Sequence, residues 1–431
     1  MRTGERLLKE GSRPEVPGDY APSVRRSVPA EVPESLLAGR AGSGHFGFVI
    51  LGAGCAGLSV CYYLLERGVT EPILILDQRT TFDDDRTWCF WDVEDTPFSH
   101  LAIESWRSWS VTSGKRTITQ TSESHPYLCL AAGDFYESVL RSIAAYPNVT
   151  LRLGEAVESR EERGAHTLVR TSGDTYAACV VLDGRGLAAG SPAFTELRQR
   201  SCWVPQQFLG MRLRTTRPVF DPEVCTLMDF SVNQSRGLRF MYALPFGERE
   251  ALVENVYLSE VEVSAEEHRA EISAYLHDHY GLLPHEYRVD GEERGYIPMT
   301  DYRFPRRIGE RSYSIGMLGG ETRPSTGYTF LRIQRYCRAL AEALAGDREP
   351  PLRADPRRFE MLDAIFLRFM RRYPERCPDI YATMFNRVPP SALVRFLTER
   401  STPLEDLRLI LALPKTPFLK VAGGMLLDRH P

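Results

Sequence analysis

The stretch FVILGAGCAGLS, residues Phe48–Ser59, decides the fold of this 431-residue chain. Its glycines follow the pattern G-x-G-x-x-G at Gly52, Gly54 and Gly57. The first glycine permits a tight turn, the second lets the backbone approach a pyrophosphate, and the third lets helix and strand pack closely. The pattern therefore predicts a phosphate-binding turn between a strand and a helix.

The flanking residues place this turn inside a β-α-β unit. Phe48–Leu51 is predicted to be a short buried strand and Gly57–Arg67 a helix. A second strand, Ile73–Leu76, ends on Asp77, 20 residues after the last glycine of the pattern. An acid at this spacing is typical of dinucleotide-binding folds. We therefore expect Asp77 to accept hydrogen bonds from ribose hydroxyls, while the helix N-terminus faces the pyrophosphate.

Two later glycine clusters favour FAD over a bare nicotinamide nucleotide. One is VVLDGRG and the other is SIGMLGGETRPSTGY; their candidate cofactor residues are Asp183, Gly184, Gly319, Gly320 and Gly327. In flavoproteins of the hydroxylase type, a strand ending in Asp-Gly and a late glycine-rich turn flank the flavin. Each cluster alone also fits an ordinary turn, so the prediction depends on the order of all three along the chain.

Composition and periodicity divide the chain into five segments. Residues 1–44 are rich in Pro, Arg, Glu, Gly and Ser, which predicts a disordered extension. We expect an α/β, Rossmann-type FAD-binding domain of the glutathione-reductase-like type in residues 45–200 and 301–350. Residues 201–300 are expected to form an inserted antiparallel-sheet domain for the substrate. Residues 351–431 are predicted to be helices broken by prolines.

Bulk composition argues against several classes of protein. The net charge of −4 is too small to predict nucleic-acid binding. Nine cysteines occur without a Cys-x-x-Cys pair, which indicates reduced thiols in a cytoplasm and neither a disulfide framework nor a zinc site. No metal site is expected, because the acidic run Asp83–Asp85 has no second ligand cluster and the histidines lack ligand spacing.

The C-terminal part is more basic than the rest. Residues 352–431 contain 14 Lys and Arg but 9 Asp and Glu. Apolar, basic segments such as FLRFMRRY, Phe366–Tyr373, predict contact with an anionic membrane surface. A solvated helical face explains the same pattern, so both interpretations stay open. The first interpretation makes the protein cytoplasmic and peripheral to the membrane.

A single acid interrupts the apolar strand ALVENVYLS, Ala251–Ser259. Burying Glu254 there as an ion is costly. Desolvation raises the pKa of a carboxyl group, by up to ~3–5 units for full burial, and keeps it protonated near neutral pH. Alternatively, Glu254 faces outward and forms an ion pair with Arg239 or Arg249 across the hairpin.

A series of stretches resembles a known family. In chain order they are FVILGAGCAGLS, DRTWCFW (Asp85–Trp91), VLDGRG, RFMYALPF followed by ALVENVY, GYIPMT (Gly295–Thr300), GMLGGETRPSTGY and the tail FNRVPPSALVRFLTER with ILALPKTPFL. In content and order the series resembles the bacterial and plant type of lycopene cyclase, over residues 45–425.

The resemblance implies an enzyme that binds FAD and needs it reduced by NAD(P)H. Such enzymes close ionone rings at the ends of linear lycopene without net redox change, and the reduced flavin stabilises a cationic transition state. The family's acid falls on Glu254, which would protonate a terminal double bond away from water. We expect β rings; ε rings, one or both ends, the nicotinamide donor and the oligomeric state stay open.

Aromatic residues near these motifs are expected to wall the substrate site and stabilise a cation. They are Trp88, Phe240, Tyr242 and Tyr257, although each is also an ordinary core residue. Arg86 is expected to contact the FAD phosphates or to cap a loop.

Two positions depart from the family pattern. Asn255 follows the acid where relatives carry Asp or an aromatic residue, which weakens any inference about ring type. The late turn reads Gly-Gly-Glu-Thr where hydroxylases have Gly-Asp, which fits a cyclase better than an oxygenase.

Two other functions stay open. An FAD-dependent polyprenoid reductase or monooxygenase would share the glycine motifs but consume reduced nicotinamide or oxygen stoichiometrically. A non-enzymatic prenyl-binding escort protein would share the fold, although an intact G-x-G-x-x-G with Asp77 argues against it.

Overall fold

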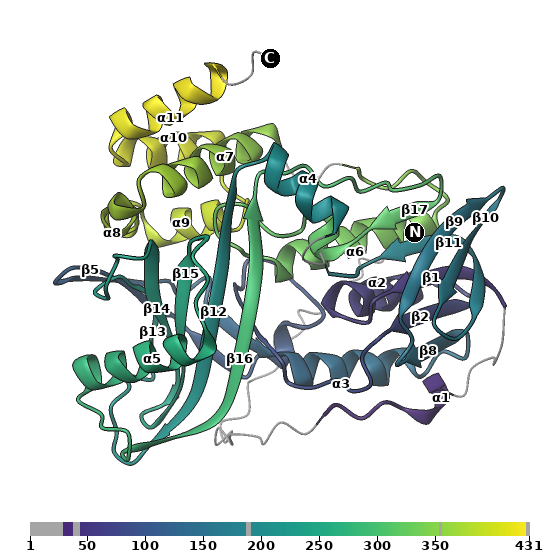
Figure 1. The fold of residues 1–431 in the computed structure, drawn as a ribbon, viewed down its shortest axis with the longest axis horizontal. Coiled ribbons are helices and arrows are strands. Elements are labelled where there is room, and N and C mark those ends of the chain that lie inside the picture. The colour runs from purple at the N-terminus through teal and green to yellow at the C-terminus, as the bar shows by residue number, and fades with distance from the viewer. Residues whose placement is uncertain (1–28, 38–43, 187–190, 353–355, 428–431) are drawn as a thin grey trace, which may run out of the picture.

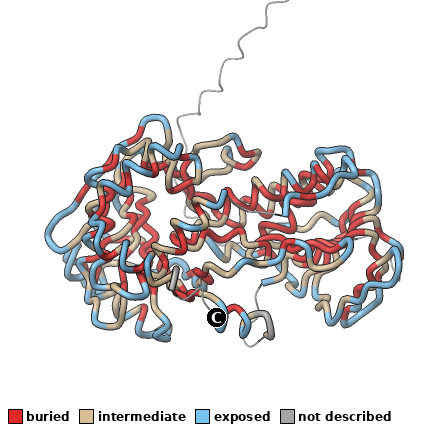
Figure 2. The backbone as a smooth tube through the Cα atoms, turned by 90° about the horizontal axis from the view of Figure 1, so that it is seen from above, coloured by how far each residue is buried: buried red, intermediate tan, exposed pale blue. Residues whose placement is uncertain are grey.

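The computed structural model describes residues 29–37, 44–186, 191–352 and 356–427. Figure 1 shows an α/β lobe, a second lobe built on long strands, and a layer of C-terminal helices over one end of the second lobe. Buried segments run through the interior of both lobes, with exposed segments at the periphery (Figure 2). Within the described ranges, each helix is too short or too polar to cross a bilayer.

The first sheet forms the predicted Rossmann-type core. Its elements are β1 (His45–Leu51), α2 (Cys55–Glu66), β2 (Ile73–Asp77), α3 (Ala132–Ile143), β8 (Val149–Leu153), β9 (Val157–Arg163), β10 (His166–Thr171), β11 (Thr175–Asp183), β17 (Ser312–Ser314), the short turn η2 (Gly316–Gly319) and α6 (Phe330–Ala345). The strand order is β8-β2-β1-β11-β10-β9, and β17 pairs with the end of β11. Both neighbours of β1 are parallel to it, as a β-α-β crossover requires. Helices α2, α3 and α6 pack together in one apolar core with this sheet.

The second sheet is mostly antiparallel. Its elements are β5 (Ser108–Ser113), β6 (Arg116–Thr121), β12 (Trp203–Thr215), β13 (Val224–Asp229), β14 (Leu238–Gly247), β15 (Glu250–Leu258), β16 (Tyr287–Thr300) and the covering helix α5 (Ala265–Tyr280). The order is β16-β12-β15-β14-β13-β5-β6, with β14 and β15 as the predicted hairpin. Strands β5 and β6 come from the part of the chain predicted for the FAD-binding domain, so the sheet draws on two separate segments.

A small third sheet joins the two lobes. It consists of β3 (Thr87–Trp91), β4 (Glu104–Trp106) and β7 (Tyr127–Ala131), in the order β3-β7-β4. Alternation along β3 sends its side chains to two sides. Phe90 packs in the core of the first lobe, and Trp91 packs in the core of the second. The motif DRTWCFW therefore lies between the lobes.

The C-terminal helices begin and end near the predicted proline breaks. They are α7 (Arg357–Arg372), α8 (Cys377–Arg387), α9 (Pro390–Leu397), α10 (Pro403–Ala412) and α11 (Lys415–Leu427). The segment FLRFMRRY was expected to contact an anionic membrane surface; its apolar side chains are mostly buried, whereas Arg371 and Arg372 are exposed. Phe366 and Phe369 of α7 stack on Phe418 of α11 in the core, and Arg368 forms an ion pair with Asp301.

Residues 29–37 correct part of the predicted disordered extension. Helix α1 (Glu34–Leu37) packs beside β8, and its Leu36 is only 1% exposed. An apolar side chain that reaches the core can order a short segment whose composition is otherwise polar. Residues 1–28 and 38–43 of the predicted extension lie outside the described residues.

Candidate active site

The glycine turn between β1 and α2 has the geometry that its motif requires. Gly52 adopts φ +95°, which favours glycine. A Cβ on Gly57 would lie 1.9 Å from the Gly52 carbonyl oxygen, so only glycine allows α2 to pack this closely. Gly54 caps α2, and the nearest atom to a Cβ there would be an Arg79 nitrogen 3.9 Å away. Gly54 therefore borders an open cradle at a helix N-terminus, which suits a pyrophosphate.

The two later glycine clusters meet this turn. A Cβ on the first glycine of the turn would lie 3.1 Å from the Gly184 carbonyl oxygen. The late turn that contains Gly319 and Gly320 approaches α2 through Gly316, where a Cβ would lie 3.0 Å from that of Ala56. Gly316 adopts φ +65°. It was not among the predicted cofactor residues, although it precedes Gly319 and Gly320 in the same motif. Three segments distant in sequence thus surround one helix N-terminus.

Gly327 lies in a different environment from the other predicted cofactor glycines. It adopts φ +74°, and a Cβ there would lie 2.9 Å from the amide oxygen of Gln206 on β12. Ile297 of β16 is the next neighbour, at 3.6 Å. Gly327 therefore packs against the second sheet, where the late motif meets the second lobe.

The two predicted acids at strand ends bond to nearby groups. Asp77 accepts three hydrogen bonds, from the backbone N–H groups of Ala53 at 2.7 Å and Arg79 at 2.9 Å and from the Arg79 guanidinium at 3.1 Å. Asp183 pairs with the guanidinium group of Arg185 at 2.7 Å. A carboxylate has about four acceptor positions. Asp77 can therefore brace the glycine turn and still accept a bond from a ribose hydroxyl.

Two arginines flank the N-terminus of α2. Burial raises the pKa of Cys55, the first residue of α2, to about 12, and the nearby positive charge of Arg86 opposes this rise. Arg86 also pairs with Asp85 at 2.7 Å. Arg79 lies beside Gly54 and over the ring of Tyr136. Their charges favour a bound phosphate, and the contribution of Arg79 was missed even though it follows Asp77 by two residues.

Glu254 lies in the middle of β15, a central strand of the second sheet, and is 7% exposed. Its partners in the ladder are Gly210 on β12 and Tyr242 on β14. Gly210 is paired on its other side with Glu293 of β16. Glu254, Gly210 and Glu293 therefore form one row across the sheet, with the glycine between two acids.

The ion-pair interpretation of Glu254 is wrong. Arg239 donates to the side-chain oxygen of Asn255 at 2.8 Å and pairs with Glu271 of α5, on the opposite face of the sheet. Arg249 donates to a backbone carbonyl. Asn255 likewise contacts α5, so the departure at this position does not alter the side chains around Glu254.

The surroundings of Glu254 favour its neutral form. Burial raises its pKa well above the usual value, and the carboxyl group of Glu293 raises it further through its charge and a hydrogen bond. Cys89 of β3 adds a smaller effect in the same direction. Thr87, two residues earlier on β3, donates to Glu293 Oε2 at 2.7 Å. The arrangement holds a protonated carboxyl in an apolar site, which suits general acid chemistry.

Two of the four predicted aromatic residues share the face of Glu254. Tyr242 is its direct cross-strand neighbour, and its hydroxyl lies 3.1 Å from that of Tyr127 on β7. Phe240 lies two residues earlier on the same face. Phe208 of β12 was missed; its ring lies over a glycine of β16, where a Cβ would come within 2.2 Å.

The other two aromatic residues do not share the face of Glu254. Tyr257 is three residues from Glu254 and therefore on the opposite face, where its hydroxyl donates to Glu271 of α5 at 2.9 Å. Trp88 lies on the far side of β3 and packs on Phe330 of α6, with ring centroids 5.6 Å apart. Because alternate residues of a strand face opposite sides of the sheet, the sequence alone could have predicted these positions.

The late motif GGETRPSTGY forms buried ion pairs. Arg323, 1% exposed, pairs with Asp363 of α7 at 3.0 Å and donates to a backbone carbonyl of α9 at 2.8 Å. Ser325 donates to the same Asp363 at 2.6 Å. Glu321, where hydroxylases carry Asp, pairs with Arg306 at 2.5 Å. The motif therefore fastens the C-terminal helices to the cofactor turn.

A narrow pocket of about 30 Å³ reaches Cys89 from the side of the C-terminal helices. Its lining comes from β3, the late motif, the first turns of α6 and the end of α9, and includes Tyr328 and Leu397. A cavity needs about 10–15 Å³ of such space for one water molecule, so this pocket has room for only a few waters. A larger ligand can enter only if these side chains move.

Comparison with known proteins places the chain in context. A family model described as "Lycopene cyclase protein" matches residues 47–422. The lycopene beta-cyclase of Pantoea ananas is 26% identical over 298 residues, which are 66% of this chain and 71% of that protein. The lycopene beta-cyclase of a Paracoccus strain is 26% identical over 394 residues, 86% of this chain and 94% of that protein.

Solved structures with the same fold are more distant in sequence. A geranylgeranyl bacteriochlorophyll reductase-like protein of Thermoplasma acidophilum matches with a TM-score of 0.55 at 14% identity, covering 88% of this chain and 96% of that one. A flavoprotein/dehydrogenase of Cytophaga hutchinsonii matches with a TM-score of 0.54 at 15% identity, covering 85% and 98%. The predicted fold class, a flavoprotein-type α/β domain with an inserted sheet and helical C-terminus, is confirmed.

Proposed function

The chain belongs to the lycopene cyclase family, and we propose that it forms β-ionone end rings on linear lycopene, in carotenoid biosynthesis, with reduced FAD and no net redox change. The observation that carries this proposal is the position of Glu254, a buried acid on the face of a sheet that meets the flavoprotein-type lobe. In this proposal Glu254 is the proton donor.

The reaction needs only proton transfers and movement of π electrons. Glu254 gives its proton to one carbon of a terminal double bond, and positive charge forms on the other carbon. The π electrons of a second double bond close a six-membered ring and move the charge into it. Loss of a proton from the ring carbon that bears the polyene, back to the Glu254 carboxylate, leaves the β-ring double bond. No atom is gained or lost, so the product is an isomer.

Residues around Glu254 can protect the cation from water. Tyr242 and Phe240 present aromatic rings on the same face, and ring faces attract cations. Phe208 adds an apolar wall from β12. A site with few polar groups prolongs the life of the cation, because a water molecule would otherwise add to it.

FAD is proposed to bind at Gly52, Gly54 and Gly57, with its pyrophosphate at the N-terminus of α2. The open side of Gly54 and the flanking charges of Arg79 and Arg86 support this site. When reduced by NAD(P)H, the flavin supplies negative charge that stabilises a nearby cation in a site of low dielectric constant.

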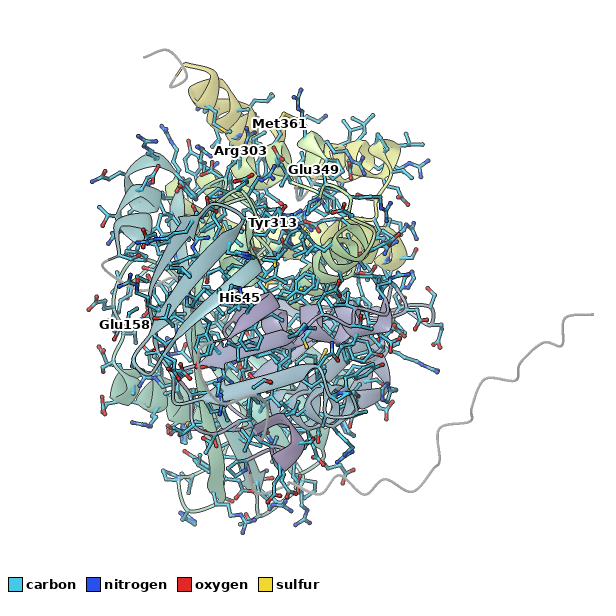
Figure 3. All side chains as sticks on the ribbon, turned by 90° about the vertical axis from the view of Figure 1, so that its right-hand side faces the viewer. His45, Glu158, Arg303, Tyr313, Glu349 and Met361 are labelled. Atoms are coloured by element: carbon cyan, nitrogen blue, oxygen red, sulfur yellow. The ribbon has the colours of Figure 1, made fainter. Side chains whose placement is uncertain are left out.

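We also propose peripheral attachment to the cytoplasmic face of a membrane, which would give access to a lipid-soluble substrate. Leu404, Leu407 and Leu411 follow helical spacing on α10 and are 57%, 49% and 55% exposed. Arg408 lies among them and is also exposed. Met361 of α7 adds an exposed apolar side chain at the same helical end of the molecule (Figure 3). An apolar helical face with basic residues suits an anionic lipid surface.

Expression in a lycopene-accumulating bacterium tests the proposed reaction. We expect cyclic carotenoid from the natural protein, and a fall of at least ~10²-fold for Glu254→Gln, which keeps the shape but removes the acid. Glu254→Asp should retain some activity. Glu248→Gln, at the exposed turn of the same hairpin, is the matched control and should cyclise normally.

Pigment analysis and flavin content distinguish the competing functions. A Glu254→Gln protein that retains flavin and forms rings at the normal rate would remove Glu254 from the mechanism. Saturated or oxygenated products, with stoichiometric use of nicotinamide or oxygen, would indicate the polyprenoid reductase or monooxygenase. Colourless, flavin-free protein that binds prenyl chains would indicate an escort protein.

A further inference from the structure

Glu254 shares the buried face of its sheet with a second acid. Glu293 on β16 is 8% exposed and is paired in register with Gly210, whose other partner is Glu254. The two acids therefore sit two strands apart, about 9.6 Å at the usual strand spacing. Side chains of this length can meet only above the residue between them.

Gly210 leaves the space in which they meet. A Cβ there would lie 2.9 Å from Glu254 Cγ and 3.2 Å from Glu254 Oε1, so the Glu254 carboxyl group extends over the glycine. It lies close enough to Glu293 for the carboxyl group of Glu293 to raise the pKa of Glu254, and Thr87 donates to Glu293 Oε2 at 2.7 Å. Two carboxyl groups can share a hydrogen bond only if one of them carries a proton.

Building on the proposed function, we propose that Glu293 is a positioning residue that shares one proton with Glu254, and that position 210 is glycine so that the two carboxyl groups can meet. The negative charge of Glu293 keeps the proton on Glu254 until substrate arrives. Once that proton has moved to a substrate carbon, two adjacent carboxylates repel each other. This repulsion makes Glu254 a stronger base, which takes one proton back from the ring and restores the pair.

Other titratable groups also face the pair. They are the thiols of Cys89 and Cys129, the hydroxyl of Tyr242 and the ion pair between Arg212 and Asp84, at 3.4 Å. Burial raises the pKa of Cys129 and of Tyr242 well above their usual values, so both stay neutral.

The test is the pH dependence of cyclisation by purified FAD-loaded protein, with lycopene in anionic phospholipid vesicles. Activity should fall at alkaline pH as Glu254 loses its proton. In Glu293→Gln this fall should move to lower pH by about one unit or more, because the like charge is gone and the amide can donate to the Glu254 carboxylate. A merely structural role would lower the rate equally at all pH values and leave the position of the fall unchanged, which would overturn the proposal.

Two glycine variants keep the test decisive if Glu293→Gln folds poorly. Gly210→Ala should move the alkaline fall in the same direction, because its methyl group displaces the Glu254 carboxyl. Gly291→Ala on the adjacent strand meets open space and should leave the profile unchanged. An unmoved profile in folded Gly210→Ala protein would contradict the proposal.

Infrared spectroscopy separates this proposal from the proposed function, because it needs no substrate. The C=O band of a protonated carboxyl group should be present in the natural protein at neutral pH, disappear in Glu254→Gln, and titrate at lower pH in Glu293→Gln. Such a band with no cyclisation would contradict only the lycopene cyclase activity. Its absence in a protein that cyclises lycopene would contradict the shared proton and a protonated Glu254, but not the cyclase activity.

Discussion

At the scale of single residues, three glycines act through the side chain that they lack. Gly57 lets α2 touch the turn, Gly54 opens a cradle at the helix N-terminus, and Gly210 lets two acids meet. The three glycines differ in which atoms a side chain added there would contact. A Cβ on Gly57 meets backbone, whereas one on Gly54 meets open space that a ligand would occupy. Only a substitution at a position such as Gly54 can test ligand binding without also disturbing the fold.

Gly54→Val should therefore fold and lose FAD. The added side chain would extend into the space assigned to the pyrophosphate, without touching protein backbone. Flavin absorbance per protein, measured after purification, should fall at least ~10-fold, since placing two methyl groups against a phosphate costs more than 1.4 kcal/mol. Gly291→Val, in open space on β16, should keep its flavin. Full flavin content in Gly54→Val would show that the cofactor binds elsewhere.

Residue-level chemistry could be predicted from the sequence where a motif fixes neighbours within a few positions. Gly52 and Asp77 belong to one β-α-β unit, so their proximity followed from spacing alone. Trp88 and Tyr257 were assigned by nearness in sequence to a motif, and alternation along the strand turns them away from Glu254. Glu293 could not be found this way, because its contact with Glu254 depends on the register of two strand pairs.

At the scale of elements, the same limit applies to strand pairing. The hairpin of β14 and β15 is local and was predicted, whereas β5 joins β13 across more than a hundred residues. Helix α10 has apolar residues on two sides. Leu409 packs in the core, and Leu407 is exposed. The proline positions predicted where these helices begin. Which apolar face is exposed to solvent is known only from the burial of each side chain in the structure.

The exposed face of α10 should bind lipid. Replacing Leu404, Leu407 and Leu411 together with Ser should weaken partition into anionic vesicles at least ~10-fold, because about half of each side chain loses apolar contact with the bilayer. Cosedimentation of protein with vesicles measures this partition.

A matched triple variant elsewhere on the surface serves as control for vesicle binding. Val261→Ser, Leu283→Ser and Val289→Ser remove similarly exposed side chains outside the C-terminal helices and should leave partition unchanged. Equal loss in both triple variants, or none in the α10 variant, would contradict attachment through this face.

At the scale of the whole molecule, the late glycine-rich motif joins three parts. Gly316 contacts α2 of the cofactor lobe, Gly327 contacts β12 of the second sheet, and Arg323 binds α7 and α9. The sequence predicted a cofactor turn here and could not predict the anchor, because Asp363 lies 40 residues further on in a region assigned only as helical. The proposed cofactor site, the second sheet and the proposed membrane face therefore depend on one short segment.

Arg323→Met should loosen this connection. Removing the guanidinium leaves Asp363 buried without its main partner, a change that typically costs ~3–5 kcal/mol. Urea unfolding followed by circular dichroism should show the loss. Arg323→Met combined with Asp363→Leu should recover part of the lost stability, because no unpaired carboxylate is then buried. Arg107→Met, which breaks an exposed ion pair with Glu123, should change little. If Arg323→Met were as stable as Arg107→Met, the late motif would not be the anchor of the C-terminal helices.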